Sequence, residues 1–248
     1  MEWYTYILVI LVGIIAGFIN TVAGSGSLLT LPLLMFLGLT PVMANGTNRV
    51  GILFQSLISA GSFRKQKILD LNSTYIMTIP VIIGSLLGAV IAVDLNEQAM
   101  ENAIGGLLVF MFFVLLLKPS EWIRNREGNP PLPGWMRVII FFLTGIYGGF
   151  IQAGVGFFLL AGLVLGAGYD LVKANAIKAL MILLFTIVAL TVFIINDQVD
   201  FFIGLILASG SMVGAYFGAR YSVKWGAGFI RYFLLATVLA SAVKLLFW

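Results

Sequence analysis

The sequence has no cysteine and no histidine among its 248 residues. Without thiols a chain forms no disulfides and has no thiolate nucleophile. Without imidazoles it lacks Ser-His-Asp triads, haem ligation and typical zinc sites. These absences exclude most common enzyme chemistries, so we expect neither an enzyme nor a protein that holds a metal ion or a cofactor.

Charged residues are also scarce, at 10% of the chain, whereas 61% of the residues are hydrophobic. Soluble domains carry about 25% charged residues, so this chain has too few polar side chains to cover a surface that faces water. The composition therefore predicts an integral membrane protein. The net charge of +4 is spread over short connections rather than one basic patch, and we do not expect nucleic acid as a partner.

Hydrophobic runs separated by charged or Gly/Pro-containing breaks divide the sequence into ten segments. Only helices and closed barrels satisfy the backbone in lipid, and no alternating pattern of the barrel type is present. We therefore expect an all-α polytopic membrane protein, whose first segment is retained because it lacks the basic start of a secretory signal. The predicted helices span residues 4–23, 27–38, 42–63, 74–93, 99–117, 137–152, 157–168, 171–195, 201–221 and 226–247.

Two of the predicted helices, 27–38 and 157–168, are too short to cross a membrane. A helix of this length extends about 18 Å, whereas the hydrocarbon core of a bilayer is about 30 Å thick. We expect each short segment to form a hairpin with the helix before it, and each hairpin to turn within the membrane.

The most polar stretch, 118–136, separates five segments from five others. It is expected to be a cytoplasmic linker between a first repeat, 1–117, and a second repeat, 137–248. Similar stretches recur in the same order at an offset of about 130 positions, which favours an internal duplication over chance similarity of glycine and alanine. The matching stretches are Gly17-Phe-Ile-Asn-Thr-Val-Ala-Gly-Ser-Gly26 with Gly149-Phe-Ile-Gln-Ala-Gly-Val-Gly156, Ala44-Asn45 with Ala174-Asn175, and Gly84-Ser-Leu-Leu-Gly-Ala89 with Gly210-Ser-Met-Val-Gly-Ala215.

The charges predict how the chain crosses the membrane. Basic residues cluster after the third, fifth and ninth segments, and these connections are expected in the cytoplasm by the positive-inside rule. The basic residues are Arg64, Lys65, Lys67, Lys118, Arg124, Arg126, Arg137, Arg220, Lys224 and Arg231, and the acidic residues of the opposite connections are Asp94, Glu97, Glu101, Asp197 and Asp200. Both termini then lie outside, and the two hairpins enter from opposite sides.

This orientation makes the two five-element repeats inverted relative to each other. Each repeat has one membrane-embedded hairpin followed by three spanning helices. Such an architecture is typical of secondary transporters, whose site lies near the midplane where discontinuous helices meet.

Both hairpin tips are rich in glycine. A helix that starts just after each turn aims unsatisfied N–H groups and a positive dipole end at the membrane centre, and two opposed helix N-termini make an anion site. The alternative is that these glycines only allow helices to pack, as expected for Gly84, Gly88, Gly210, Gly214 and Gly218. Polar residues accompany the glycines at the tips, which favours a binding site. Its predicted members are Asn20, Thr21, Gly24, Ser25, Gly26, Ser27, Gln152, Gly154, Val155, Gly156 and Phe157.

Two cations, Arg49 and Lys178, are predicted deep within hydrophobic segments, with Asn45, Asn48 and Asn175 within one helical turn of them. A buried cation is costly unless it faces a partner or a watery cavity, so both are candidate site residues, with snorkelling to the interface as the alternative. The predicted segments contain no carboxylate within the membrane, so a bound anion is the expected counter-ion. The same absence leaves Lys178 as the candidate proton carrier.

These residues resemble the TauE/SafE family of sulfite exporters, also called the four-toluene-sulfonate uptake permease family. The resemblance covers nearly the whole chain, and the first tip carries Leu31-Pro32 beside its glycines. It implies transport of a small sulfur-containing anion, such as sulfite, thiosulfate, sulfoacetate or another organosulfonate, linked to protons across a plasma (inner) membrane. The second tip departs from the first because Val155 stands where the first tip has a hydroxyl.

We therefore expect a secondary transporter in the lipid bilayer, with the anion held by the two tips, the neighbouring amides and the two cations. Alternating access would expose this site to each side in turn. A passive anion channel on the same scaffold and a membrane structural subunit without a solute site are the alternative functions.

Overall fold

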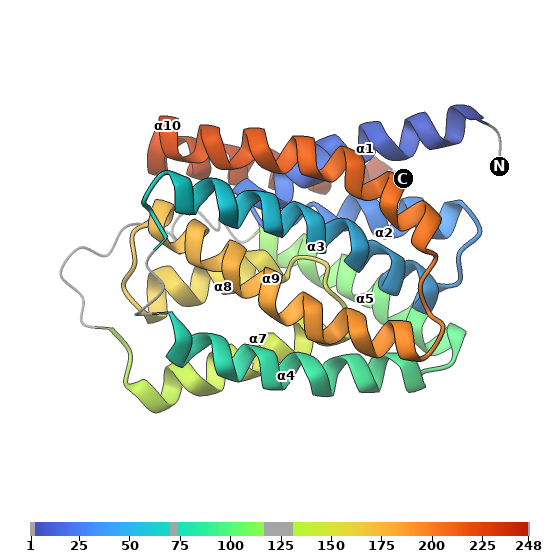
Figure 1. Ribbon diagram of the computed structural model, residues 1–248, viewed down its shortest axis with the longest axis horizontal. Helices are drawn as coiled ribbons and strands as arrows, with labels where there is room; N and C mark the ends of the chain where they lie inside the picture. The colour runs from blue at the N-terminus through green and yellow to red at the C-terminus, as the bar shows by residue number, and fades with distance from the viewer. Residues whose placement is uncertain (1–2, 70–73, 117–130, 248) are drawn as a thin grey trace.

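The computed structural model of the protein describes residues 3–69, 74–116 and 131–247, and the regular structure in these ranges is helical (Figure 1). Most of the predicted linker, 118–136, lies outside the described residues. The elements are α1 (Trp3–Val22), α2 (Ser27–Phe36), α3 (Pro41–Lys65), α4 (Tyr75–Asp94), α5 (Glu97–Leu116), α7 (Gly134–Phe150), α8 (Val155–Ala161), the π-helical segment η1 (Gly162–Gly166), α9 (Leu171–Ile195) and α10 (Phe201–Phe247).

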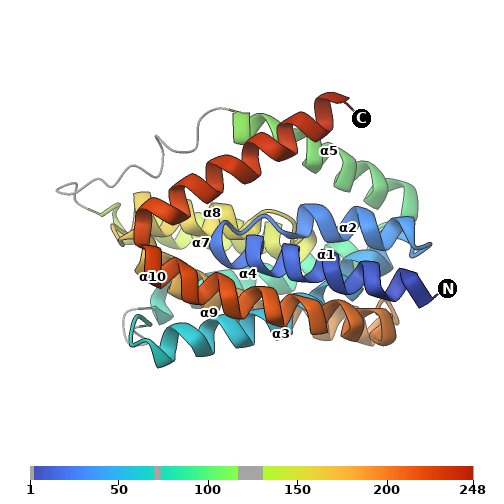
Figure 2. The same ribbon diagram turned by 90° about the horizontal axis from the view of Figure 1, so that it is seen from above.

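Most predicted helices match these bounds to within three residues, and α9 has the predicted bounds. The predicted non-helical connection at 222–225 is wrong, because the helical backbone of α10 continues through it, but the expected reversal of the chain is present because α10 turns back on itself (Figure 2). Lys224 interrupts the hydrophobic run, but neither proline nor glycine interrupts the backbone there. Figure 2 shows the ribbon of α10 turning back at its left-hand end, so its later part runs back across the molecule.

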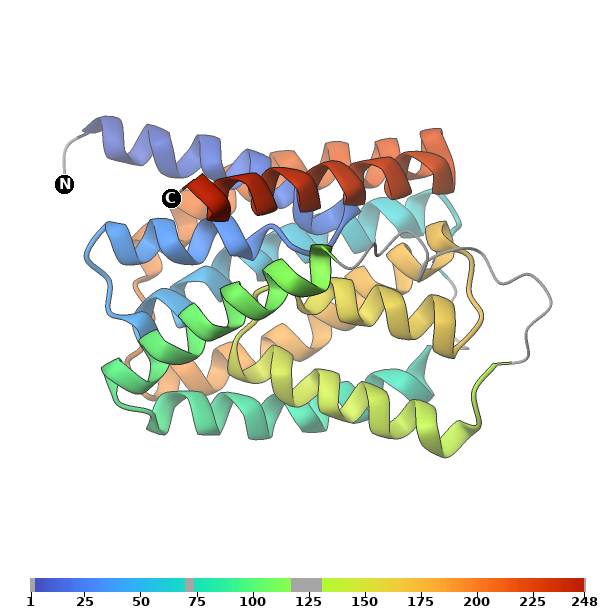
Figure 3. The same ribbon diagram turned by 180° about the vertical axis from the view of Figure 1, so that it is seen from behind.

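Both predicted hairpins are present. The chain turns at Gly24 and Gly154, whose φ angles of +81° and +74° lie in the left-handed region that favours glycine. Because Gly154 completes the second turn, α8 begins at Val155, two residues before the predicted start. Figure 3 shows α8 lying beside α7 after this turn. The second helix of each hairpin, α2 in the first and α8 in the second, is short, as predicted.

The helices pack as two glycine-lined pairs on either side of a central group. In Figure 1, α1 and α10 lie along the top, α4 and α7 lie along the bottom, and α3 and α9 lie between them. A Cβ atom on Gly17 would overlap the backbone of Ser211, and one on Gly149 would overlap the backbone of Ser85. Small residues therefore bring both pairs into backbone contact, which is typical of helix packing in membranes.

Basic and acidic residues lie at opposite ends of the helices. At one end, the last turns of α3 pack with the start of α9 and the middle of α10, near Arg64, Lys173 and Arg220. At the other end, the α4–α5 and α9–α10 connections pack together and carry Asp94 and Asp197. Figure 2 shows these ends at the left and right. The connections that the sequence assigned to the same side of a membrane thus meet at the same end.

Four helical stretches are long and apolar enough to cross a membrane: Trp3–Val22, Tyr75–Asp94, Leu171–Ile195 and Phe201–Trp225. The outer faces of these helices expose large aliphatic side chains, among them Ile79 and Ile83 of α4. By contrast, α3 carries Asn45, Arg49 and Gln55 as buried residues. The structure is therefore that of a helical membrane protein with an apolar exterior and a polar centre.

Candidate functional site

The two hairpin tips meet at the centre of the protein. Gly24 of the first tip lies against Gly156 of the second, and a Cβ atom on either residue would overlap the backbone of the other. Asn20 and Gln152, the polar residues just before the two turns, are both buried. The motifs that the sequence placed in separate halves thus form one site.

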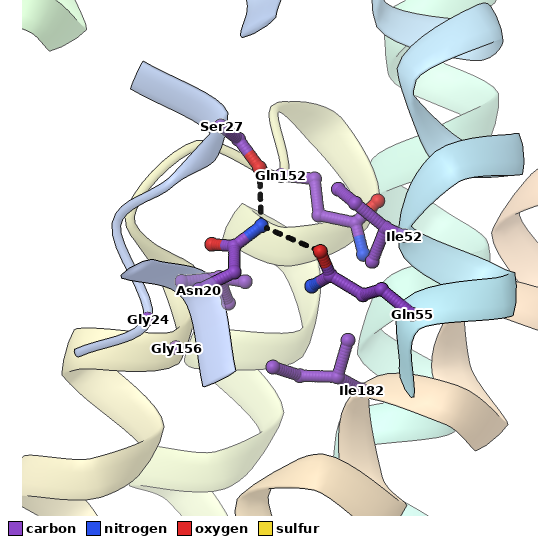
Figure 4. Close-up of a pocket in the computed structure, with 9 residues that line it drawn as sticks. Asn20, Gly24, Ser27, Ile52, Gln55, Gln152, Gly156 and Ile182 are labelled. Atoms are coloured by element: carbon purple, nitrogen blue, oxygen red, sulfur yellow. Dashed lines mark hydrogen bonds between the residues drawn. The ribbon is translucent and has the colours of Figure 1, made fainter. Parts of the chain in front are cut away.

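A small cavity of about 10 Å³ lies between the tips, which is room for about one water molecule (Figure 4). Of the residues predicted for the site, Asn20, Gly24, Ser27, Gln152, Val155 and Gly156 line the cavity. The remaining lining residues are Ile52, Gln55 and Ile182. Amide and hydroxyl groups face two isoleucines there, and the described residues that line the cavity include no charged side chain.

Asn20 connects three elements around the cavity. Its Nδ2 atom donates to Ser27 Oγ at 3.3 Å and to Gln55 Oε1 at 3.5 Å. Its Oδ1 atom accepts a hydrogen bond of 2.8 Å from the backbone N–H of Gly26. One amide thus joins the end of α1, the first turn, the start of α2 and the middle of α3.

Gln152 has a similar position in the second half. Its Nε2 atom donates to Thr186 Oγ1 of α9 at 2.6 Å, and its Oε1 atom accepts from Arg49 Nη1 of α3 at 3.4 Å. Both ends of the Gln152 amide are therefore used within the protein.

Lys178 of α9 binds the end of α1. Its Nζ atom donates to the carbonyl oxygens of Asn20 at 3.2 Å and Thr21 at 2.9 Å. Carbonyls in the last turn of a helix lack intrahelical partners and carry the negative end of the helix dipole. The ammonium group therefore caps α1 from the other half of the chain.

Arg49 of α3 caps the end of α7 in the same way. Its Nη1 and Nη2 atoms donate to the carbonyl oxygens of Gly148 at 3.1 Å and Gly149 at 2.5 Å, and its guanidinium lies 4.6 Å from the ring centre of Phe193. Arg49 is 0% exposed and Lys178 is 1% exposed. Neither side chain snorkels, and both have helix-end carbonyls as partners beside any anion that binds.

The other predicted site residues do not line the cavity. Ser25, Gly26, Gly154 and Phe157 belong to the two turns and the helix starts that follow them. The polar side chains bind neighbouring elements: Asn45 Nδ2 donates to Phe150 O at 2.7 Å, Asn48 Oδ1 accepts from Thr30 Oγ1 at 2.6 Å, and Asn175 Nδ2 donates to Ser222 Oγ at 3.4 Å. Five buried atoms of these predicted residues have no hydrogen bond: Thr21 Oγ1, Asn45 Oδ1, Asn48 Nδ2, Arg49 Nε and Asn175 Oδ1.

Three cavity residues escaped the sequence analysis: Ile52, Gln55 and Ile182. A signal for them exists, because Asn48, Ile52 and Gln55 follow the spacing of one helix face. Ile182 follows Lys178 by one turn, and it matches Ile52 at the offset between the repeats. Charged side chains and glycine tips stand out in a hydrophobic sequence, whereas a neutral glutamine further along α3 does not.

These features define a polytopic helical membrane protein with a buried cluster of polar side chains between two hairpins. Residues 9–245 match the profile of the family described as "Sulfite exporter TauE/SafE", and the chain belongs to this family. It is a membrane transporter of that family, as the sequence resemblance predicted.

Curated relatives extend over nearly the whole chain. A "Probable membrane transporter protein ORF9" of Sinorhizobium sp is 28% identical, covering 94% of this chain and 88% of its own. The "Probable membrane transporter protein YfcA" of Escherichia coli K12 is 28% identical, covering 95% and 87%. A "Probable membrane transporter protein" of Haemophilus influenzae is 27% identical, covering 89% and 86%. No solved structure matches the chain.

Proposed function

We propose that the protein is a secondary transporter that moves a small sulfur-containing anion, such as sulfite, thiosulfate or sulfoacetate, across the plasma membrane. The observation that carries this proposal is the cavity between the two tips, with neutral donors in its lining and two buried cations next to it. The lining includes no carboxylate to repel an anion. The description of the family as sulfite exporters supports the choice of sulfur anions.

The proposed mechanism is alternating access between two inverted repeats. Matching contacts in the two halves support it: Gly17 of α1 meets Ser211 of α10, and Gly149 of α7 meets Ser85 of α4. The pairing of Arg49 with α7 and of Lys178 with α1 has the same symmetry. Inverted repeats of this kind open one site to each side of a membrane in turn.

The cavity is smaller than the proposed substrate. Room for about one water molecule is too little for an anion with three or more heavy atoms. In this conformation the contact between Gly24 and Gly156 leaves no room for the anion between the tips. Anion binding then requires the two tips to separate.

The proposal also includes the orientation of the protein in the membrane and the ion that drives transport. The basic end of the helices faces the cytoplasm, the acidic end faces outward, and both termini lie outside. Protons are the proposed coupling ion. Lys178 is the proposed carrier, because it is a buried titratable group beside the first tip.

The test is an anion panel on the purified protein, followed by flux in proteoliposomes. A ligand that binds only the folded state raises its thermal stability, so we expect a sulfur anion, and neither chloride nor acetate, to raise the Tm. Saturable flux of the same anion at low turnover identifies a transporter, whereas single-channel currents identify a passive channel. If no anion raises the Tm or crosses the membrane, the protein is a structural subunit and the proposal fails.

A further inference from the structure

We propose that Gln55 of α3 binds the transported anion directly, through a hydrogen bond from its amide N–H to an oxygen of the anion. This inference rests on the proposed function. Gln55 lines the cavity, is 4% exposed, and comes from a different helix than the tips. Neither the glycine motifs nor the charges of the sequence point to it.

The orientation of the Gln55 amide follows from a backbone group. The N–H of Gly26 is a donor only, so the Asn20 atom that faces it must be the oxygen. The Nδ2 atom of Asn20 then faces Gln55, and the Gln55 atom that accepts from it must be Oε1. This chain of hydrogen bonds leaves Gln55 Nε2 on the other side of the amide.

The free side of this amide points into the cavity. Figure 4 shows Gln55 Nε2 directed toward the space between Asn20 and Ile182. Within the part of the chain that the structure describes, no group accepts a hydrogen bond from this nitrogen. This nitrogen borders the cavity, where an oxygen of a bound anion would accept its hydrogen bond (Figure 4).

Gln152 and the terminal nitrogens of the two cations have partners within the protein. Gln152 Nε2 donates to Thr186, and the Arg49 and Lys178 head groups donate to carbonyls of α7 and α1. The cations thus supply positive charge beside the site, while Gln55 supplies a directional hydrogen bond inside it.

The test compares Gln55→Met, which keeps the length of the side chain without its amide, with Gln98→Met as the matched control. Gln98 lies on α5, and its amide donates to Asn102 in an exposed position. The probes are sulfite, thiosulfate, sulfoacetate and chloride, and the readouts are the anion-dependent rise in Tm and the half-saturating concentration for flux. We expect Gln55→Met to raise the half-saturating concentration of the sulfur anion at least tenfold, whereas Gln98→Met leaves it unchanged.

Gln55→Asn serves as a second variant if the methionine variant does not fold. Asparagine keeps the amide donor, but its side chain is one methylene group shorter, so the donor no longer reaches as far into the cavity. It is expected to weaken binding in the same direction. Unchanged affinity in a folded Gln55 variant overturns the role of Gln55 and leaves the proposed function standing. If the wild type responds to none of the sulfur anions, the proposed function fails, and this inference fails with it.

Discussion

Single residues connect the two halves of the protein across long stretches of sequence. Lys178 Nζ binds carbonyls 157 and 158 positions away, and Arg49 binds carbonyls 99 and 100 positions away. Each cation stabilises the end of a helix that stops inside the protein by donating to carbonyls of its last turn. Under the proposed function the same charges attract the anion to the tips, so stability and binding would depend on the same two side chains.

Replacing Lys178 with Met tests this double role. We expect the rise in Tm with a sulfur anion to disappear, because the positive charge next to the first tip is lost. The anion-free protein should lose about 1–3 kcal/mol of stability, because the Thr21 carbonyl is left without its hydrogen bond. Thermal unfolding in detergent measures both effects, with exposed Lys224→Met as the control. Full retention of the anion response would exclude Lys178 from the site.

The Arg49→Lys variant tests whether a positive charge at position 49 is sufficient for transport. Lysine keeps the charge, but it lacks the planar fork with which Arg49 reaches Gly148, Gly149 and Gln152 together. We expect folded protein with flux reduced about tenfold or more, which corresponds to about 1.4 kcal/mol. Flux equal to that of the wild type would show that the guanidinium geometry has no role in transport.

At the scale of elements, glycines determine how closely the paired helices approach. In the α4–α7 pair, Gly149 leaves no room for a Cβ atom against Ser85, whereas Gly105 of α5 has no atom within 4 Å of the same position. The two glycines therefore provide a matched comparison between a packing site and an open helix surface.

We expect Gly149→Ala to lower the Tm by several degrees and to impair transport, because α7 must move away from α4 and carry the second tip with it. Gly105→Ala should leave the Tm unchanged or raise it, since alanine favours a helix by about 0.5–1 kcal/mol over glycine. Equal Tm values for the two variants would contradict the close packing of α4 and α7.

At the scale of the whole molecule, the separation of charges gives the protein two distinct ends. The α4–α5 turn carries Glu97 and Glu101, whereas the turn of α10 carries Arg220 and Lys224. Under the positive-inside rule this polarity sets the orientation in the membrane. The chain has no native cysteine, so a single introduced thiol reports which side its position occupies.

Asn102→Cys and Lys224→Cys place that thiol at the two ends, on side chains that are exposed in the structure. In intact cells we expect a membrane-impermeant maleimide to label Cys at position 102 and to spare Cys at position 224. Permeabilised cells should show labelling at both positions, which controls for reactivity. The opposite pattern in intact cells would invert the proposed orientation.

Much of this protein follows from its sequence alone. Hydrophobic runs located the helices because each run reports burial of a contiguous segment, and the glycines marked both turns because a positive φ favours a residue without a side chain. At 222–225 the sequence predicted a non-helical connection, whereas the backbone of α10 stays helical where it turns back (Figure 2). The same local reasoning overlooked Gln55, because a neutral side chain shows its role only through its neighbours.

The sequence by itself thus determined a helical membrane protein with two hairpins, buried cations and a charge difference between its ends. The tertiary structure alone decided that Gly24 meets Gly156, that Lys178 and Arg49 cap helices of the opposite halves, and that Gln55 faces the cavity. The physical reason is the distance along the chain over which each effect acts. Helix and turn preferences act over a few residues, whereas a binding site depends on distances between elements far apart in the chain.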